Sequence, residues 1–342
     1  MVVRDLLSIT FLVGIGVLNA GPLSPDENRL RHETCGGFNL PMSEKVIEGT
    51  PDYTNTSEET WLLTIHQKGN GNPIPKTTAF LISPRHIMTS AQVVIGGDRT
   101  WKFLGFGKRP KIDFGCTVNG SIHGNYSLPT EALETLDIWD PVKSLDVKVV
   151  KGRLFYSCLN NTRVDHVPLL LEISPTTTRQ VPCFVDEQYT SNYKNGDEVH
   201  SYGVSIEKTM KHHKIQLESN NDSIWYVTNL YREGGQDRGG PLVRVNKGKS
   251  TVIGLKYNDP PTKEEPPMYF FNLGAIEKEI CEFSGVCWKF PTLATTSKTT
   301  VTKSITLNPD EENAEEDDDD PNTSIGKLEL LEIVIIFCFY WM

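Results

Sequence analysis

The segments TAFLISPRHIMTSAQ (residues 78–92) and GQDRGGPLV (residues 235–243) decide the fold. Each combines apolar and β-branched residues with a turn rich in Gly, Pro or Ser, which is typical of short β-strands joined by tight loops. Similar runs recur through residues 45–287, and we expect strands at residues 60–66, 79–82, 101–106, 146–150, 200–204, 223–230, 242–245 and 251–256. Short strands at this spacing predict an all-β barrel or sandwich.

One segment has a helical period instead. Leu273, Ile276 and Ile280 are three and four residues apart, with charged residues between them. This pattern predicts a helix over residues 272–283, at the end of the folded region. No other segment shows it, so we expect a single helix.

The N-terminal end has the features of an export signal. Arg4 precedes an apolar run over residues 6–18, and small residues follow up to Gly21. This order predicts a signal peptide, residues 1–20, cleaved after Ala20; the alternative is an uncleaved anchor. We therefore expect a secreted, extracellular protein.

The C-terminal end changes composition twice. Residues 291–324 are rich in Thr, Ser and acids and indicate a disordered stalk. Residues 325–342 end in an apolar run of about half the length of a membrane-spanning helix. With the small residues 322–324 and a short spacer, this tail has the arrangement of a glycolipid-anchor signal. Because Glu329 and Glu332 interrupt it, a tail without that role is the alternative.

Charge and histidine content limit the partners. The net charge is −10, of which −8 belongs to residues 292–342, so the folded region is close to neutral. It has no basic stripe, and we expect no nucleic-acid partner. The pair His212-His213 has no Cys or His at ligand spacing, so we expect surface histidines, no metal and no cofactor.

Cysteines and sequons agree with export. Six cysteines fall in the folded region and could pair in 15 ways: Cys35, Cys116, Cys158, Cys183, Cys281 and Cys287. Oxidising compartments favour such pairing. Glycosylation sequons occur at Asn55, Asn119, Asn125, Asn160, Asn221 and Asn322.

Four segments within residues 45–280 resemble the trypsin and chymotrypsin-like serine peptidases, in that family's order. They are KVIEGT (residues 45–50), the segment ending at Gln92, DHVPLLLE (residues 165–172) and the segment around Arg238. The cysteine layout and the ending GVC (residues 285–287) resemble a divergent branch expanded in nematodes. The resemblance implies two six-stranded antiparallel β-barrels with a C-terminal helix, a propeptide-like segment over residues 21–45 and a peptidase-like domain over residues 46–290.

The resemblance places the catalytic histidine, aspartate and serine at Gln92, Asp165 and Arg238. In an active enzyme the histidine accepts the serine proton and the aspartate holds the imidazole in the useful tautomer. A carboxamide does not titrate near neutral pH, and a guanidinium has no lone pair for attack. No catalytic residue pair is therefore intact.

Asp165 is expected to be buried and to need a new donor in place of the histidine. The Gln92 amide could supply one, and whether Arg238 reaches the carboxylate is open. The alternative is that Asp165 caps a surface turn. His166 is adjacent, but neighbouring strand residues point to opposite faces, so we do not expect it to replace the base.

Other positions implied by the resemblance have also changed. Arg232 stands at the base of the specificity pocket, although a solvated surface arginine is the alternative. Gln236 and Arg238 stand at the oxyanion-hole positions. Gln236 replaces a glycine whose backbone N–H helps to form that hole in the family. Lys45 and Val46 form the activation junction. Cleavage between them would release a new amino terminus at Val46, which would pair with Asp237.

The resemblance also implies disulfides. Cys35–Cys183 resembles the bridge that tethers a propeptide, and Cys281–Cys287 closes a local loop. These two pairs leave Cys116–Cys158 as the third disulfide. The family's disulfide beside the histidine is missing, because its positions fall near Thr77 and at Val93.

We therefore predict a secreted, monomeric, non-catalytic serine-protease homologue. Its partner would be a protein or peptide of extracellular proteolysis or defence. One alternative is an active secreted serine endopeptidase with a non-standard site, for which Ser83 and Ser90 are candidates, although we expect neither to have a neighbouring base. Another is a structural surface glycoprotein.

Overall fold

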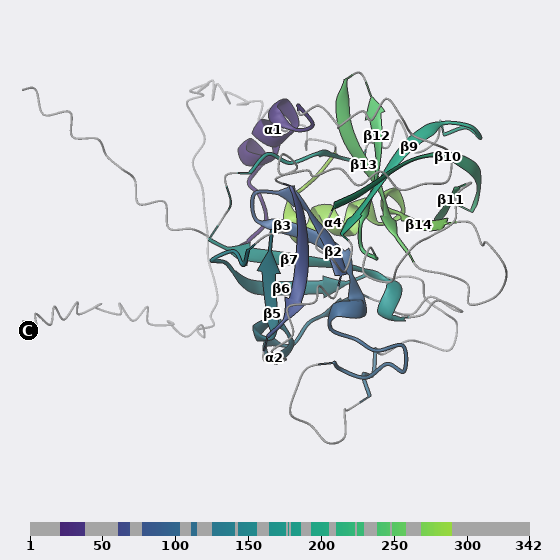
Figure 1. The fold of residues 1–342 in the computed structure, drawn as a ribbon. Coiled ribbons are helices and arrows are strands. Elements are labelled where there is room, and N and C mark those ends of the chain that lie inside the picture. Colours follow the sequence, from purple (N-terminus) through teal and green to yellow (C-terminus); the bar gives the residue numbers. More distant parts are fainter. Residues whose placement is uncertain are drawn as a thin grey trace, which may run out of the picture. The chain divides into compact units, whose positions relative to one another are not determined.

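The computed structural model describes residues 21–37, 61–68, 77–102, 111–114, 125–140, 143–155, 164–175, 177, 179–185, 193–204, 210–222, 224–228, 238–246, 248–257 and 268–288. The predicted signal peptide, the stalk and the C-terminal tail lie outside these residues. Figure 1 shows that the described part is mostly β-structure, with a helix near each of its two ends.

The first sheet contains seven antiparallel strands in the order β4-β6-β7-β3-β2-β1-β5. Within the described residues it forms a half-barrel. Its strands are β1 (Leu62–Gln67), β2 (Thr77–Ser83), β3 (His86–Ser90), β4 (Tyr126–Ser127), β5 (Leu136–Trp139), β6 (Lys148–Leu154) and β7 (Pro168–Ser174).

The second sheet closes on itself. Its order is β12-β9-β10-β11-β14-β13-β8, and an additional β12–β13 pairing completes a six-stranded antiparallel barrel, to which β8 adds a short parallel pairing. Its strands are β8 (Cys183–Phe184), β9 (Glu198–Val204), β10 (Met210–Asp222), β11 (Trp225–Thr228), β12 (Pro241–Asn246), β13 (Lys249–Lys256) and β14 (Met268–Asn272). The predicted all-β double-barrel class is confirmed, with seven rather than six strands described in each sheet.

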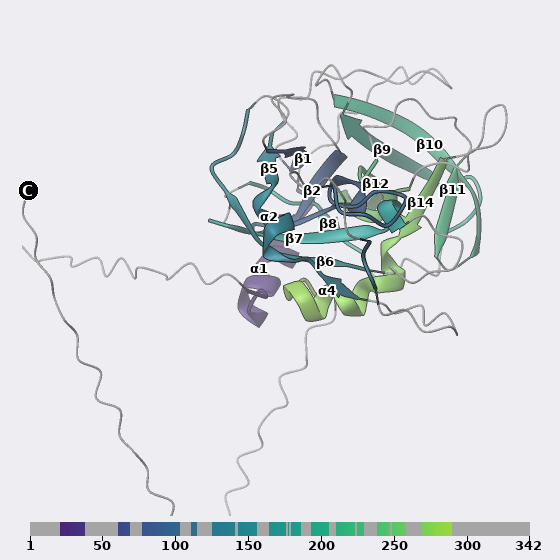
Figure 2. The same cartoon turned by 90° about the horizontal axis from the view of Figure 1, so that it is seen from below.

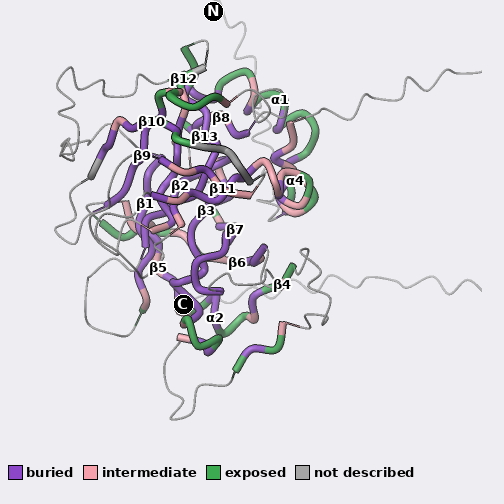
Figure 3. The backbone as a smooth tube through the Cα atoms, turned by 90° about the vertical axis from the view of Figure 1, so that its right-hand side faces the viewer, coloured by how far each residue is buried: buried purple, intermediate pink, exposed green. Residues whose placement is uncertain are grey.

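The two sheets meet along β2. Every residue of β2 is buried, and Thr78 Oγ1 accepts a hydrogen bond of 3.0 Å from the Val204 N–H of the second sheet. A strand covered on both sides shows no alternation of apolar and polar residues. Figure 3 shows the buried backbone running through both sheets.

The C-terminal helix is present, and two further helices were missed. The 3₁₀-helix η3 (Leu273–Ile276) leads into α4 (Glu277–Ser284), which ends one residue beyond the predicted range of 272–283. The prediction of a single helix is wrong, because α1 (Pro25–Thr34) and the short α2 (Thr130–Glu134) also form. Ser24 and Glu27 make a capping box at the start of α1, a signal visible in the sequence.

The N-terminal helix is held at both of its ends. Arg85 donates to both Glu27 carboxylate oxygens and to the Gly21 and Pro22 carbonyls, each at 2.9 Å. A Cys35–Cys183 disulfide fixes the other end. Figure 2 shows α1 beside α4, and the Leu23 N–H donates to the Ser284 carbonyl at 2.7 Å. Among the described residues, no helix is long and apolar enough to cross a membrane.

Candidate functional site

Two 3₁₀-helices bring Gln92 and Asp165 together. Gln92 lies in η1 (Ala91–Val93), directly after β3. Asp165 lies in η2 (Val164–His166), which a single residue separates from β7. Ser90 Oγ donates to the Asp165 carbonyl at 3.0 Å, and the Ala91 N–H donates to the Val167 carbonyl at 2.9 Å. These bonds join the two turns at the same end of paired strands β3 and β7.

Hydrogen bonds to both sheets fix the backbone at Arg238 and Gly239. Its carbonyl accepts hydrogen bonds from the Thr78 N–H at 2.9 Å and from Thr77 Oγ1 at 2.6 Å. Thr77, near which the resemblance places a cysteine of the missing disulfide, thus donates a hydrogen bond instead. The next residue, Gly239, has a φ of +78°, and its N–H donates to the Lys256 carbonyl at 3.1 Å.

A hydrogen bond joins Arg238 to Gln92, the two positions at which the resemblance places the serine and the histidine. Arg238 Nη1 donates to Gln92 Oε1 at 2.9 Å. Gln92 is 6% exposed. Since the Gln92 oxygen accepts from Arg238, a contact between the Gln92 amide and Asp165 stays a prediction.

Asp165 is buried, at 3% exposure, so the alternative of a surface turn is wrong. Its Oδ2 lies 3.5 Å from His166 Nε2. The two residues belong to a 3₁₀-helix rather than a strand, so the argument from opposite strand faces does not apply to them. The buried His166 ring instead packs edge-on against Tyr257, with centroids 4.9 Å apart.

Two lysines that the sequence did not single out belong to this site. Lys102 Nζ donates to the Gln92 carbonyl at 2.7 Å. Lys256 is 2% exposed, and its N–H donates to the Gly240 carbonyl at 2.7 Å. A lysine at the end of the apolar run of residues 252–255 was a visible signal for Lys256, whereas only the folded chain reveals Lys102.

The expectation about the alternative serine nucleophiles is wrong in one respect. Ser83 Oγ and His86 Nδ1 lie 2.8 Å apart, so this serine does have a neighbouring base. Both residues are 0% exposed, and no substrate can reach them. Burial, and then the charges of Arg85 and Lys151, lower the pKa of His86 to about 3, which makes it a weak base.

The prediction that His212 and His213 lie on the surface is wrong, because both are buried. His212 Nε2 lies 2.8 Å from His200 Nδ1, and burial lowers the pKa of His200. The antiparallel pairing of β9 with β10 brings these two imidazoles together. Within the described residues, no group of three or more His, Cys, Asp or Glu side chains is arranged to hold a metal ion.

The remaining predicted positions divide into two groups. The structure contains the Cys35–Cys183 and Cys281–Cys287 disulfides and places Asn125 at the surface, with Asn221 in β10. The other positions lie outside the described residues: Arg232, Gln236, Asp237, Lys45, Val46, Cys116, Cys158, Asn55, Asn119, Asn160 and Asn322.

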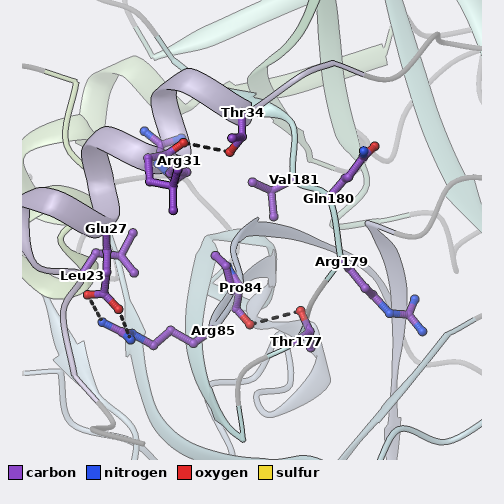
Figure 4. A pocket seen from close by; sticks show the side chains of 11 residues that line it. Leu23, Glu27, Arg31, Thr34, Pro84, Arg85, Thr177, Arg179, Gln180 and Val181 are labelled. Atoms are coloured by element: carbon purple, nitrogen blue, oxygen red, sulfur yellow. Dashed lines mark hydrogen bonds and ion pairs between the residues drawn. The ribbon is translucent and has the colours of Figure 1, made fainter. Parts of the chain in front are cut away.

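A cavity of about 500 Å³ lies away from this site, against α1. Its lining includes apolar Leu23, Pro84 and Val181, with the Arg85–Glu27 ion pair at one end (Figure 4). Burial alone would raise the pKa of Glu27, but hydrogen bonds from Arg85 and Ser24 and the Arg85 charge lower it.

A comparison with models of known families agrees with the peptidase resemblance. The model of the nematode trypsin-6-like family matches residues 6–287. The crystal structure of the scabies mite inactivated protease paralogue S-I1 matches with a TM-score of 0.47 and 15% sequence identity, over 68% of this chain and 97% of that chain. A search of curated proteins finds no match.

Proposed function

The chain belongs to the nematode trypsin-6-like family, and we propose that it is a secreted, non-catalytic homologue of the serine peptidases. Its role would be to bind a protein or peptide partner in extracellular proteolysis or defence.

The hydrogen bond between Arg238 and Gln92 is the observation that carries this proposal. In the peptidase mechanism these two positions must exchange a proton, from a hydroxyl nucleophile to an imidazole base. Here the donor is a guanidinium, which stays protonated below a pH of about 12, and the acceptor is a neutral amide oxygen. Neither group can attack a carbonyl or accept a proton near neutral pH, so the pair supports a scaffold without acyl-transfer chemistry.

The surroundings of the pair support retention of the scaffold for another purpose. Backbone hydrogen bonds still hold the Arg238 carbonyl and the Gly239 N–H, although Arg238 cannot act as a nucleophile. Asp165 likewise stays buried. The two disulfides are typical of proteins from oxidising compartments, which favours an extracellular place of action.

A turnover assay tests the proposal against the hydrolase alternative. The purified full chain is incubated with fluorogenic peptide amides that present basic, aromatic, small and acidic side chains before the scissile bond. We expect no release of fluorophore above the buffer rate, while active trypsin as the control cleaves the basic substrate. Turnover that scales with protein concentration would contradict the proposal, provided that an Arg238→Ala variant loses it, because a contaminating protease would be unaffected by that change.

A further inference from the structure

One face of α1 borders the cavity described above. Glu27, Leu30 and Arg31 all line this cavity, and residues three or four apart lie on the same side of a helix. Pro84 and Val181 lie across the cavity from the helix (Figure 4). The volume of about 500 Å³ falls within the range of about 300 to 1,000 Å³ that is usual for small-molecule sites.

The lining combines apolar side chains with polar groups that bond to the chain itself. Arg85 donates to both carboxylate oxygens of Glu27. Thr34 Oγ1 donates to the Leu30 carbonyl at 2.8 Å. The apolar residues of the lining are Leu23, Leu30, Pro84 and Val181. A ligand with an alkyl chain fits such a lining, because burying its methylene groups is favourable.

Arg31 differs from Arg85 because it has no carboxylate partner. It is 4% exposed, its Nε donates to Asn28 Oδ1 at 3.1 Å, and its Nη2 lies 3.1 Å from His32 Nε2. Among the described residues, its buried Nη1 has no hydrogen-bond partner and no carboxylate forms an ion pair with the side chain. Burial lowers the pKa of Arg31 to about 10, so the guanidinium is charged at neutral pH. A buried charge is costly unless an anion pairs with it.

We propose that the cavity binds a monocarboxylate with an unbranched alkyl chain, which is the chemistry of a medium-chain fatty acid. The chain contacts the apolar lining, and the carboxylate accepts charge-assisted hydrogen bonds from Arg31. Because Nη1 is covered, the guanidinium turns toward the cavity as the ligand binds. This proposal goes beyond the proposed function, since neither Gln92 nor Arg238 lines the cavity.

Isothermal titration calorimetry on the full chain at pH 7.5 tests this proposal, with octanoate as the probe. We expect octanoate to bind at one site per chain. Octanol has the same chain without the charge and should bind about tenfold more weakly. Hexanoate should also bind about tenfold more weakly than octanoate, because each buried methylene group contributes a factor of about three to four.

Variants on α1 assign the binding to this cavity. Arg31→Met keeps an unbranched side chain without the charge, so octanoate affinity should fall about tenfold while octanol affinity stays the same. Arg29→Met is the matched control: it removes the same charge from a side chain that is 63% exposed, and it should change the octanoate affinity less than twofold. Leu30→Ala shortens the apolar lining and should weaken octanoate and octanol equally, by about threefold.

Three outcomes would overturn the proposal: octanol binding as tightly as octanoate, equal effects of Arg31→Met and Arg29→Met, or no saturable binding of octanoate. If Arg31→Met does not fold, the ratio of the octanoate and octanol affinities of the wild-type chain still decides. None of these results concerns catalysis, so the proposed function would stand. Conversely, turnover in the fluorogenic assay would remove the proposed function even if octanoate bound.

Discussion

The backbone conformation of a single residue, Gly239, sets the position of Arg238 before it. Its φ of +78° lies in the left-handed region, and a Cβ there would lie 2.5 Å from the Thr78 carbonyl oxygen and 2.8 Å from the Ser90 nitrogen. Both neighbours are backbone atoms of the first sheet and cannot move aside cheaply. Glycine is therefore required by the geometry of the turn, independently of any reaction.

The first prediction concerns this glycine. Gly239→Ala should lower the free energy of unfolding by about 2 to 5 kcal/mol, because the left-handed conformation and the collision both add cost. Gly248 is the control: its φ is +76°, but nothing lies within 4 Å of an added Cβ. Gly248→Ala should cost only about 1 to 2 kcal/mol. Chemical denaturation measures both, and equal losses would contradict the collision.

The α1 helix shows how one element can be locally encoded and yet depend on distant contacts. The capping box of Ser24 and Glu27 starts it, but of its ten residues only Asn28 and Arg31 are buried, and Leu30 is 59% exposed. An isolated helix of ten residues is marginal in water. The Arg85 hydrogen bonds and the Cys35–Cys183 disulfide therefore hold it against the domain.

The second prediction compares the two disulfides. Cys35 and Cys183 are 148 residues apart, whereas Cys281 and Cys287 are 6 apart. On the chain-entropy account, replacing the first pair by serine should cost about 5 kcal/mol and replacing the second about 2 kcal/mol. Denaturation of the two double-serine variants measures the difference. A larger loss of stability on replacing Cys281–Cys287 than on replacing Cys35–Cys183 would show that the Cys35–Cys183 disulfide does not hold α1.

Across the whole molecule, features marked by neighbouring residues could be predicted from the sequence, whereas contacts between distant segments could not. The motifs around Gln92, Asp165 and Arg238 could be identified because neighbouring residues mark them. The burial of His212 could not, because it depends on the pairing of β10 with β9. The Lys102 contact with Gln92 likewise exists only after the chain has folded.

The third prediction is a dependence of stability on pH. The pKa of His86 falls from 6.5 in the unfolded chain to about 3 in the folded protein, mainly through burial. Below pH 6.5 the unfolded chain therefore binds a proton that the folded protein does not. The free energy of unfolding should be highest above pH 6.5 and fall, through this group alone, by about 2 kcal/mol between pH 7.5 and pH 5.

A His86→Asn variant checks this assignment. Asparagine keeps a polar atom near Ser83 and does not titrate, so the loss of stability between pH 7.5 and pH 5 should be smaller by that amount. Burial also lowers the pKa values of His32 and His200, and they leave a residual slope in the same direction. Identical pH profiles for wild type and variant would show that His86 does not contribute.

The central claim is that Arg238 and Gln92 leave no nucleophile in this site. Labelling with a fluorophosphonate probe, followed by intact-mass spectrometry, tests it most directly because the probe reacts with activated serines irrespective of substrate preference. With active trypsin labelled in parallel, we predict that the mass of the full chain stays unchanged. A mass increase of one probe per chain, mapped to any serine of this protein, would contradict the account.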